Sequence, residues 1–169
     1  RIPTNTDLYY SDSSTLGNEF LRPEKALSTE LGFRLRQNNW KLSLALFQRD
    51  AKNYIDYVKS AGDERWQATN IDQILSHGGE LDVVVNINRH KFAMGYAYLK
   101  DDVERISSVL SRYAINSRKH HVSSRWTLRW NSFITSSVSY RYAEQDSGYN
   151  YNVVDANMSY AKGRVKLSL

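Results

Sequence analysis

Apolar and polar residues alternate with a period of two along most of this chain of 169 residues. From Leu27 to Leu35 the odd positions are apolar or Thr, whereas Ser, Glu, Gly and Arg lie between them. Side chains of a β-strand point alternately to the two faces of a sheet, so this pattern gives a strand one apolar and one polar face. A helix over the same residues would place Glu30 and Arg34 beside Leu27 and Leu31 and would have no clean apolar stripe. The alternation therefore predicts β-strands.

The same alternation recurs along the chain and predicts an all-β fold. The predicted strands are 27–35, 40–47, 75–87, 92–98, 121–130, 134–142, 154–160 and 165–169. Short polar turns are expected at 37–39, 88–90, 131–132 and 162–164, and long polar connections at 57–68, 100–120 and 143–151. Because sequential strands joined by short turns pair in antiparallel fashion, we expect an antiparallel up-and-down meander of about eight strands.

Alternation alone does not distinguish a soluble sandwich from a membrane barrel, because both have one apolar and one polar face. An outer-membrane barrel directs its apolar face to lipid, has short turns at one rim and long loops at the other, and carries aromatic residues at both interfaces. The alternating connection lengths and the Tyr residues near strand ends favour the membrane barrel. A mean hydropathy of -0.61 is compatible with it, because only about half of each strand faces lipid.

The composition excludes several classes of chemistry. The absence of Cys excludes disulfides, zinc–thiolate sites, iron–sulfur clusters and Cys catalysis. The net charge of +5 is spread along the chain, with no Lys/Arg block typical of nucleic-acid binding. No Ser nucleophile elbow, HExxH, P-loop or GxGxxG motif is present. We therefore expect neither an enzyme, nor a cofactor, nor a nucleic-acid partner.

The N-terminal part of the chain contains three closely spaced motifs. They are Pro3-Thr4-Asn5-Thr6-Asp7-Leu8-Tyr9-Tyr10, Gly17-Asn18-Glu19-Phe20-Leu21-Arg22-Pro23-Glu24-Lys25 and Glu30-Leu31-Gly32. Together they resemble the hallmark of TonB-dependent outer-membrane receptors. Weaker similarities follow at Asn53-Tyr54-Ile55, His77-Gly78-Gly79-Glu80-Leu81, Gly95-Tyr96-Ala97-Tyr98 and Val153-Val154-Asp155-Ala156. Their order and spacing agree with the family over most of the chain.

The resemblance implies a 22-stranded barrel around an N-terminal plug, in the outer membrane of a Gram-negative bacterium. Such receptors capture a scarce nutrient at their outer loops, and the TonB complex, acting through the plug, drives its import. The Tyr-rich motif is similar to cobalamin- and siderophore-type members, so cobalamin or a ferric siderophore is the expected ligand, with lipid and lipopolysaccharide around the wall. Residues 1–169 would then be a partial C-terminal β-barrel domain, part of a larger transmembrane β-barrel, without the plug domain and the final strands.

Two alternatives remain open at this stage. A self-contained small barrel, either a soluble carrier or an eight-stranded outer-membrane protein, would pair the strand at Leu27 with the strand at Val165. An outer-membrane enzyme with a site on its loops is the weaker option. Burial separates the carrier from the membrane barrel. A dry centre formed by Leu42, Leu81, Val138 and Met158 would contradict the import hypothesis.

Aromatic residues in the expected loops are the best candidates for binding a nutrient. Aromatic faces bind flat, partly apolar molecules and lose little rotamer freedom on binding. They are equally expected as anchors at a membrane interface. The candidates are Tyr9, Tyr10, Tyr57, Trp66, Tyr113, Tyr149 and Tyr151, together with His120.

Charged residues with the parity of the polar face form a second group. They are Glu30, Arg34, Glu80, Asp82, Arg125, Arg129 and Arg141. They could contact the plug or an anionic substrate, but a ladder of cross-strand charge pairs is the favoured interpretation.

The long 100–120 connection contains an acidic group and a set of apolar residues at helical spacing. Its acidic residues Asp101, Asp102 and Glu104 lack the spacing of a calcium loop, so a solvated loop is favoured. Val103, Ile106, Leu110 and Tyr113 recur at helical spacing, which is compatible equally with a short amphipathic turn and with an irregular loop.

Overall fold

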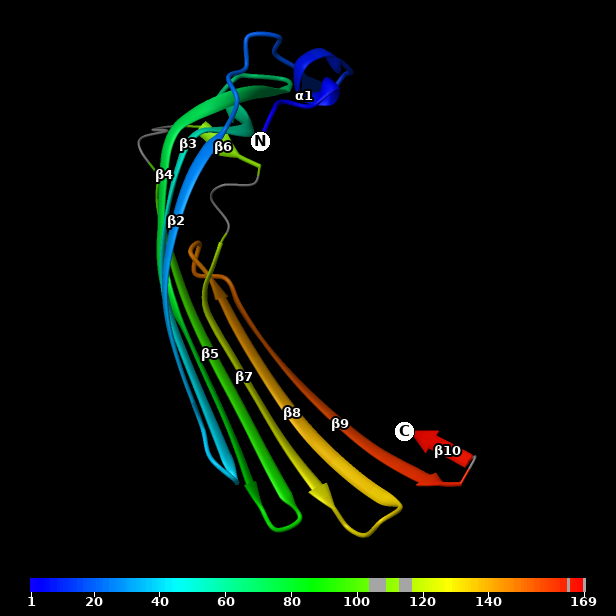
Figure 1. Cartoon of the computed structure of the whole chain (residues 1–169). Helices are drawn as coiled ribbons and strands as arrows, with labels where there is room; N and C mark the ends of the chain where they lie inside the picture. The colour runs from blue at the N-terminus through cyan, green and yellow to red at the C-terminus, as the bar shows by residue number, and fades with distance from the viewer. Residues whose placement is uncertain (104–108, 113–116, 164, 169) are drawn as a thin grey trace. The chain divides into compact units, whose positions relative to one another are not determined.

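The computed structural model describes residues 1–103, 109–112, 117–163 and 165–168 (Figure 1). One short helix, α1 (Asn5–Tyr9), precedes the strands. The strands are β1 (Thr15–Leu16), β2 (Lys25–Arg36), β3 (Trp40–Ser60), β4 (Trp66–Ile87), β5 (His90–Val103), β6 (Val109–Ser111), β7 (Arg118–Arg129), β8 (Ile134–Gln145), β9 (Asn150–Lys162) and β10 (Val165–Ser168). No helix among the described residues is long and apolar enough to cross a membrane.

Eight of the strands follow one another in a single sheet and confirm the predicted meander. Their order is β10-β9-β8-β7-β5-β4-β3-β2. The two short strands lie off this path: β1 pairs with β4 in parallel, and β6 pairs with β3 in antiparallel fashion. Among the described residues, the edge strands β2 and β10 are not paired with each other. The closure that a self-contained small barrel requires is therefore not seen.

The chain divides into two compact units. The first comprises Arg1–Glu30, Phe47–His77 and Lys100–Ser117, and the second comprises Leu31–Leu46, Gly78–Leu99 and Arg118–Leu169. Buried apolar clusters lie in the first unit, where one contains Leu21 and Ile55 and the other contains Ile71 and Ile74.

The second unit exposes one face rich in large apolar side chains. Met94 is 60% and Val154 69% exposed. Joint burial of four apolar residues would indicate a soluble carrier. Of these four, Leu81, Val138 and Met158 are exposed and Leu42 is half-buried. These residues form no common core, so the result expected for a soluble carrier is not found among the described residues.

Strand lengths in the first unit differ from the sequence-based prediction. The predicted long connection at 57–68 is wrong, because β3 continues to Ser60 and β4 begins at Trp66. Asn53 lies within β3 with a φ of 53°, and a left-handed residue inside a strand is typical of a β-bulge. The even apolar positions that precede it, from Trp40 to Leu46, do not continue past Asn53, where apolar residues such as Ile55 and Val58 occupy both parities. This break in the period of two concealed the continuation of the strand.

The other two long connections also required correction. The 143–151 connection is shorter than predicted, since β8 extends to Gln145 and β9 begins at Asn150. In the 100–120 connection, Val103 ends β5 and Leu110 lies in β6, so the helical interpretation is wrong for these two residues. Ile106 and Glu104 lie outside the described residues.

Candidate functional site

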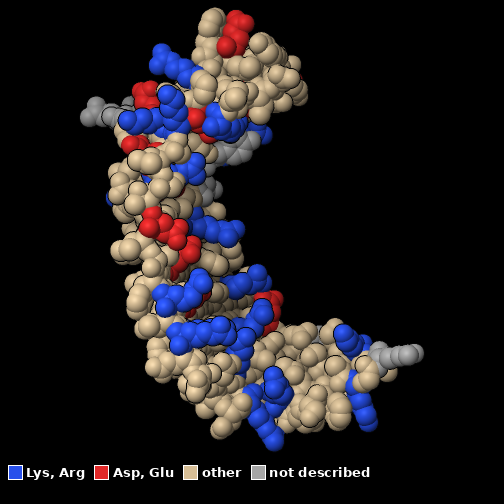
Figure 2. Space-filling model, in the orientation of Figure 1, with Lys and Arg blue, Asp and Glu red and all other residues tan. Residues whose placement is uncertain are grey.

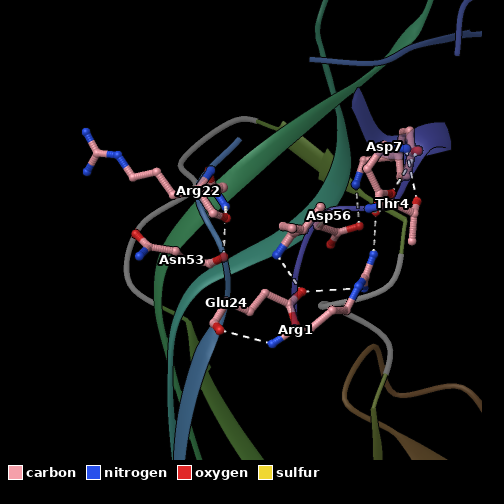
Figure 3. A network of polar contacts seen from close by, with 10 residues as sticks. Arg1, Thr4, Asp7, Arg22, Glu24, Asn53 and Asp56 are labelled. Atoms are coloured by element: carbon pink, nitrogen blue, oxygen red, sulfur yellow. Dashed lines mark hydrogen bonds and ion pairs between the residues drawn. The ribbon is translucent and has the colours of Figure 1, made fainter. Parts of the chain in front are cut away.

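A network of polar contacts fixes the N-terminal segment to β3 (Figure 3). The Arg1 guanidinium lies 2.7 Å from Asp7 Oδ2, and the hydroxyl of Tyr57 on β3 donates to Asp7 Oδ1 over 3.1 Å. Glu24 Oε1 accepts from the backbone N–H of Ile55 over 2.9 Å and lies 3.4 Å from Arg1 Nη1. Asp7 and Glu24 both belong to the N-terminal motifs between residues 3 and 25, together called the family-like motif. Their carboxylates therefore tie the helix and the start of β2 to one segment of β3.

Asp7 is a deeply buried acid of this network, at 4% exposed. Burial by itself would raise the pKa of its carboxyl. Hydrogen bonds from the backbone and hydroxyl of Thr4, from Arg1 and from Tyr57 outweigh burial and hold that pKa below its usual value. The same ion pair raises the pKa of Arg1. Thr4 and Asp7 also form the capping box of α1.

Replacing Asp7 with Asn should destabilise this unit above about pH 4. A depressed folded-state pKa stabilises the fold above the unfolded carboxyl value of about 3.9, and this contribution disappears as the pH falls through the folded value. At neutral pH we expect Asp7→Asn to lower the free energy of unfolding by about 1.5–3 kcal/mol, the usual range for hydrogen bonds to a charged group. Unfolding of the full-length protein, followed by proteolysis between pH 2.5 and 7, measures the effect.

Asp12→Asn is the matched control, because Asp12 is an exposed acid with local partners only. Equal losses of stability for Asp7→Asn and Asp12→Asn, or a loss that persists unchanged at pH 2.5, would contradict the role assigned to Asp7.

Other residues of the family-like motif also have structural partners. A Cβ at Gly17 would lie 2.9 Å from the carbonyl carbon of Leu8, so only glycine fits without a shift of the backbone. The Asn18 side chain donates to the carbonyl of Ala68 over 3.2 Å. The backbone N–H of Arg22 donates to the Asn70 side chain over 2.8 Å. The motif thus builds a docked N-terminal segment.

Two of the predicted ligand contacts lie in strands of this unit, not in loops. Tyr57 is 8% exposed and packs with Leu21 and Ala68, and Trp66 packs against the same cluster. The guanidinium of Arg112 lies 5.8 Å from the centre of the Trp66 ring. The placement of Tyr57 and Trp66 in a loop was wrong because the strands extend further than predicted. Whether either touches a ligand remains a prediction.

Three other candidates have exposed rings. Tyr9 ends α1 and is 68% exposed, and Tyr10 caps it and is 47% exposed. The Tyr10 hydroxyl donates to Asp12 over 2.9 Å. Tyr149, in the connection between β8 and β9, is 65% exposed. These rings are available for contact in this structure.

The remaining candidates occupy different faces of the second unit or fall outside the described part. His120 lies on the apolar face with Tyr96 and Tyr98, and its Nδ1 is 2.8 Å from the Tyr96 hydroxyl. Tyr151 lies inside β9, not in a loop, opposite Ala143. Tyr113 lies outside the described residues. The aromatic candidates are therefore not gathered into a single site among the described residues.

A polar groove runs across β4, β5, β7, β8 and β9 on the face opposite the apolar one. Its lining includes Asp82, Lys91, Ser123, Arg125, Arg141 and Asp155. A Cβ at Gly95 would lie 2.8 Å from Ser123 Oγ and 2.9 Å from Asp82 Oδ1. Glycine therefore leaves room for these polar groups in the groove.

The charges of this groove contact their cross-strand neighbours. Arg141 on β8 pairs with Asp155 on β9 at 2.8 Å, and Arg125 Nε donates to Ser139 Oγ over 3.0 Å. The favoured interpretation, a cross-strand charge pair, is confirmed for Arg141, whereas the cross-strand partner of Arg125 is a neutral hydroxyl. Sequence reasoning had not selected Ser123, Ser139 or Asp155, although strand parity could have identified them.

The described residues hold no group of three or more His, Asp or Glu side chains placed to bind one metal ion. The groove instead presents hydroxyls, guanidinium groups and carboxylates, which can form hydrogen bonds to a polar solute or to another polypeptide surface.

Comparison with known proteins identifies relatives of the whole chain. The family model described as TonB dependent receptor-like, beta-barrel, matches residues 1–169. The vitamin B12 transporter BtuB of Vibrio vulnificus is 27% identical over 84 residues, which are 50% of this chain and 13% of that protein.

Solved structures show the same fold at low sequence identity. The copper transporter OprC gives a TM-score of 0.78 at 16% identity, covering 99% of this chain and 28% of that one. The siderophore receptor PirA of Acinetobacter baumannii gives a TM-score of 0.67 at 14% identity, covering 90% and 28%. This chain spans little more than a quarter of either structure.

Proposed function

We propose, since this chain belongs to the TonB-dependent receptor-like β-barrel family, that it forms part of the wall of an outer-membrane receptor for energy-coupled nutrient uptake. The observation that carries the proposal is the exposed apolar face of the second unit, which has aromatic clusters near both ends of its strands. Such a band, flanked by aromatic girdles, is the usual lipid-facing surface of an outer-membrane barrel.

The height of this band supports a membrane-spanning wall. At one end, His90, Phe92 and Trp126 stack, with ring centres of His90 and Trp126 5.9 Å apart. At the other end, the ring centres of Tyr98 and His120 lie 5.2 Å apart. His90 and Tyr98 are eight residues apart on β5, or about 27 Å along the strand at ~3.4 Å per residue. At the usual strand tilt of about 40° this length corresponds to about 20 Å along the membrane normal, which approaches the height of about 25 Å that is typical of an apolar band.

The chain is proposed to be one sector of a wider barrel. Its described edge strands, β2 and β10, are unpaired with each other, and open strand edges are not stable in a bilayer. Further strands would complete the ring, consistent with relatives that are more than three times longer. The TonB complex, acting through a plug, is the proposed partner inside the cell envelope, and lipid and lipopolysaccharide are the proposed surroundings.

Cobalamin is the first nutrient to test, and a ferric siderophore the second. The sequence similarity includes a vitamin B12 transporter, whereas the siderophore receptors resemble this chain in fold at 14–18% identity. The exposed rings of Tyr9, Tyr10 and Tyr149 are proposed to contact the nutrient, since aromatic faces suit flat, partly apolar ligands.

An uptake assay tests the function. The full-length protein that carries this chain is expressed in a Gram-negative host lacking its own outer-membrane cobalamin and siderophore receptors. We expect accumulation of labelled cobalamin, or of ferric siderophore in the second arm, that stops when TonB is deleted or the proton gradient is collapsed. A protein that reaches the outer membrane but imports neither nutrient would overturn the assignment.

A further inference from the structure

The strand ends joined by short turns in the second unit carry basic residues and no acidic ones. This short-turn rim comprises residues 34–41, 86–91, 127–134 and 158–168, which contain no Asp or Glu. Figure 2 shows Lys and Arg without Asp or Glu at this end of the visible surface. Fixed charges of one sign raise the local concentration of ions of the opposite sign. The short-turn rim therefore attracts anions.

Two arginines lie side by side where this rim meets the polar face of the sheet. Arg129 is opposite Thr135 on β8 and has the strand parity of Arg125, which lines the polar groove. The backbone N–H of Arg129 donates to the carbonyl of Arg89, in the turn between β4 and β5, over 2.9 Å. The Arg89 guanidinium donates to the carbonyl of Trp130 over 3.0 Å. Two like charges held this close repel each other, and an anion placed between them would remove that cost.

The two arginines line one small recess together with Asn131 and Ser132. Asn131 Oδ1 already accepts from the backbone N–H groups of Phe133 and Ile134, at 2.8 and 2.9 Å. The side chain of Asn131 therefore offers its amide N–H₂, and Ser132 offers a hydroxyl. Guanidinium groups with amide and hydroxyl donors beside them match the two oxygens of a carboxylate.

Lys91 extends the positive charge from the recess into the polar groove. It lies on β5 two residues beyond Arg89 and lines the groove. Among the described residues, none of Arg89, Lys91 and Arg129 forms an ion pair with a carboxylate. Further along the groove, by contrast, Asp155 is paired with Arg141 at 2.8 Å. Positive charge is thus left uncompensated at one end of the groove. Arg89, Lys91 and Arg129 are called its basic end below.

The exposure of the basic end argues against a small free anion as its occupant. All three cations are exposed, and ion pairs between exposed groups contribute little to binding. An anionic group carried by a longer molecule would be held by further contacts along the groove. The groove offers such contacts, since the hydroxyls of Thr127 and Ser137, which face each other on β7 and β8, form no hydrogen bond with another described residue.

A polypeptide segment matches both parts of this surface. Its carbonyl groups accept hydrogen bonds from hydroxyls, and its Asp or Glu carboxylates accept from guanidinium and ammonium groups. The recess has no aromatic or aliphatic side chain in its lining, so a lipid would find no apolar contact there. This chain covers 28% of two solved structures of the same fold. A segment from the rest of a longer protein would be tethered to this face at high effective concentration.

We propose that the basic end of the groove docks an acidic polypeptide segment of the same protein, from outside residues 1–169. Asp or Glu side chains of that segment lie against Arg89, Lys91 and Arg129, and its backbone continues along the hydroxyls of the groove. The proposal rests on the proposed function only in taking this chain to be one sector of a longer receptor. It adds the sign of the charge that the docked segment carries and the residues that hold it.

Carbodiimide crosslinking of the full-length protein in isolated outer membranes tests the docking. The reagent joins an ammonium group to a carboxylate in direct contact and adds no spacer atoms, and mass spectrometry then identifies the joined peptides. We expect Lys91 to be joined to Asp or Glu of a peptide outside residues 1–169. The side chain introduced by Arg129→Lys should be joined to the same peptide. Lys162 is the matched control, because it is an exposed lysine of the same rim whose Nζ lies over the Phe133 ring and not in the groove.

Charge removal tests whether the contact is electrostatic. We expect the double variant R89Q/R129Q to lower the crosslinking yield at Lys91 about fivefold, because two exposed ion pairs are lost. Salt at about 1 M should lower the wild-type yield as well, since it screens exposed charges. Arg118→Gln should leave the yield unchanged, because Arg118 is an exposed arginine at the other end of β7. Heat-modifiable migration confirms that each variant is folded.

Three results would overturn the proposal. They are crosslinks of Lys91 and Arg129→Lys only to carboxylates within residues 1–169 or to none, crosslinks only to a different protein, and an unchanged yield in the folded double variant. Wild-type uptake is measured in parallel. TonB-dependent uptake without the crosslink rejects the docking alone, whereas an arginine-dependent crosslink in a protein that imports no nutrient rejects the proposed function alone.

Discussion

Replacing Val154 with arginine should prevent the full-length protein from assembling in the outer membrane. Val154 is 69% exposed and lies in one cross-strand row with Tyr140, Ser124 and Met94. Met94 in this row is four residues from both His90 and Tyr98 on β5, so the row crosses the apolar band between its aromatic ends. An arginine on the lipid face near the midplane costs about 2–4 kcal/mol. The folded fraction in isolated outer membranes, measured by heat-modifiable migration, should fall sharply.

The opposite face of the sheet supplies the control. Ser137 on β8 lies in the polar row, opposite Thr127 and Asn157. Ser137→Arg adds the same side chain on the face where arginines already occur, so we expect near wild-type assembly. Equal loss of both variants would indicate general disruption of the sheet, and normal assembly of both would contradict a lipid-facing surface.

Strand alternation predicted the second unit well because its two faces differ in composition. The strand predicted at 134–142 corresponds to β8, Ile134–Gln145, which has the expected antiparallel neighbours. Polar residues such as Arg141 and apolar ones such as Val138 occupy opposite faces there, so the polarity of each residue indicates which face of the sheet it occupies. The polar groove follows from the same parity, although its smaller members carry too weak a signal to be selected individually.

The first unit was predicted less well because its strands do not depend on a clean apolar stripe. Asp56 on β3 is 0% exposed and accepts hydrogen bonds from the Tyr57 backbone N–H and from the Ser111 hydroxyl on β6. A buried acid with a partner 55 residues away has no local sequence signature. Together with the left-handed Asn53, it accounts for a predicted strand that ended at 47 and for a predicted connection that included residues 57–60 of β3. The ligand candidates there were consequently assigned to the wrong surroundings.

Tyr57→Ala should lower the stability of the receptor more than it affects ligand contacts. The Tyr57 ring is buried with Leu21 and Ala68, and its hydroxyl supports the carboxylate of Asp7. Removing a buried aromatic side chain costs about 3–5 kcal/mol. Tyr57→Phe keeps the ring and loses a hydrogen bond to a charged carboxylate, worth about 1.5–3 kcal/mol. Urea unfolding of the full-length protein in detergent, with proteolysis as the readout, should rank the wild type, Tyr57→Phe and Tyr57→Ala in that order of decreasing stability.

A variant at the exposed Tyr9 distinguishes a loss of nutrient binding from the loss of stability expected at Tyr57. Tyr9→Ala removes a ring that is 68% exposed, so we expect unchanged unfolding and about tenfold weaker nutrient binding, equivalent to ~1.4 kcal/mol. Tyr57→Phe should bind the nutrient almost as the wild type does, since it preserves the packing that supports α1. If Tyr57→Ala were as stable as the wild type but bound the nutrient more weakly, Tyr57 would be a ligand contact and its assignment to the core would be wrong.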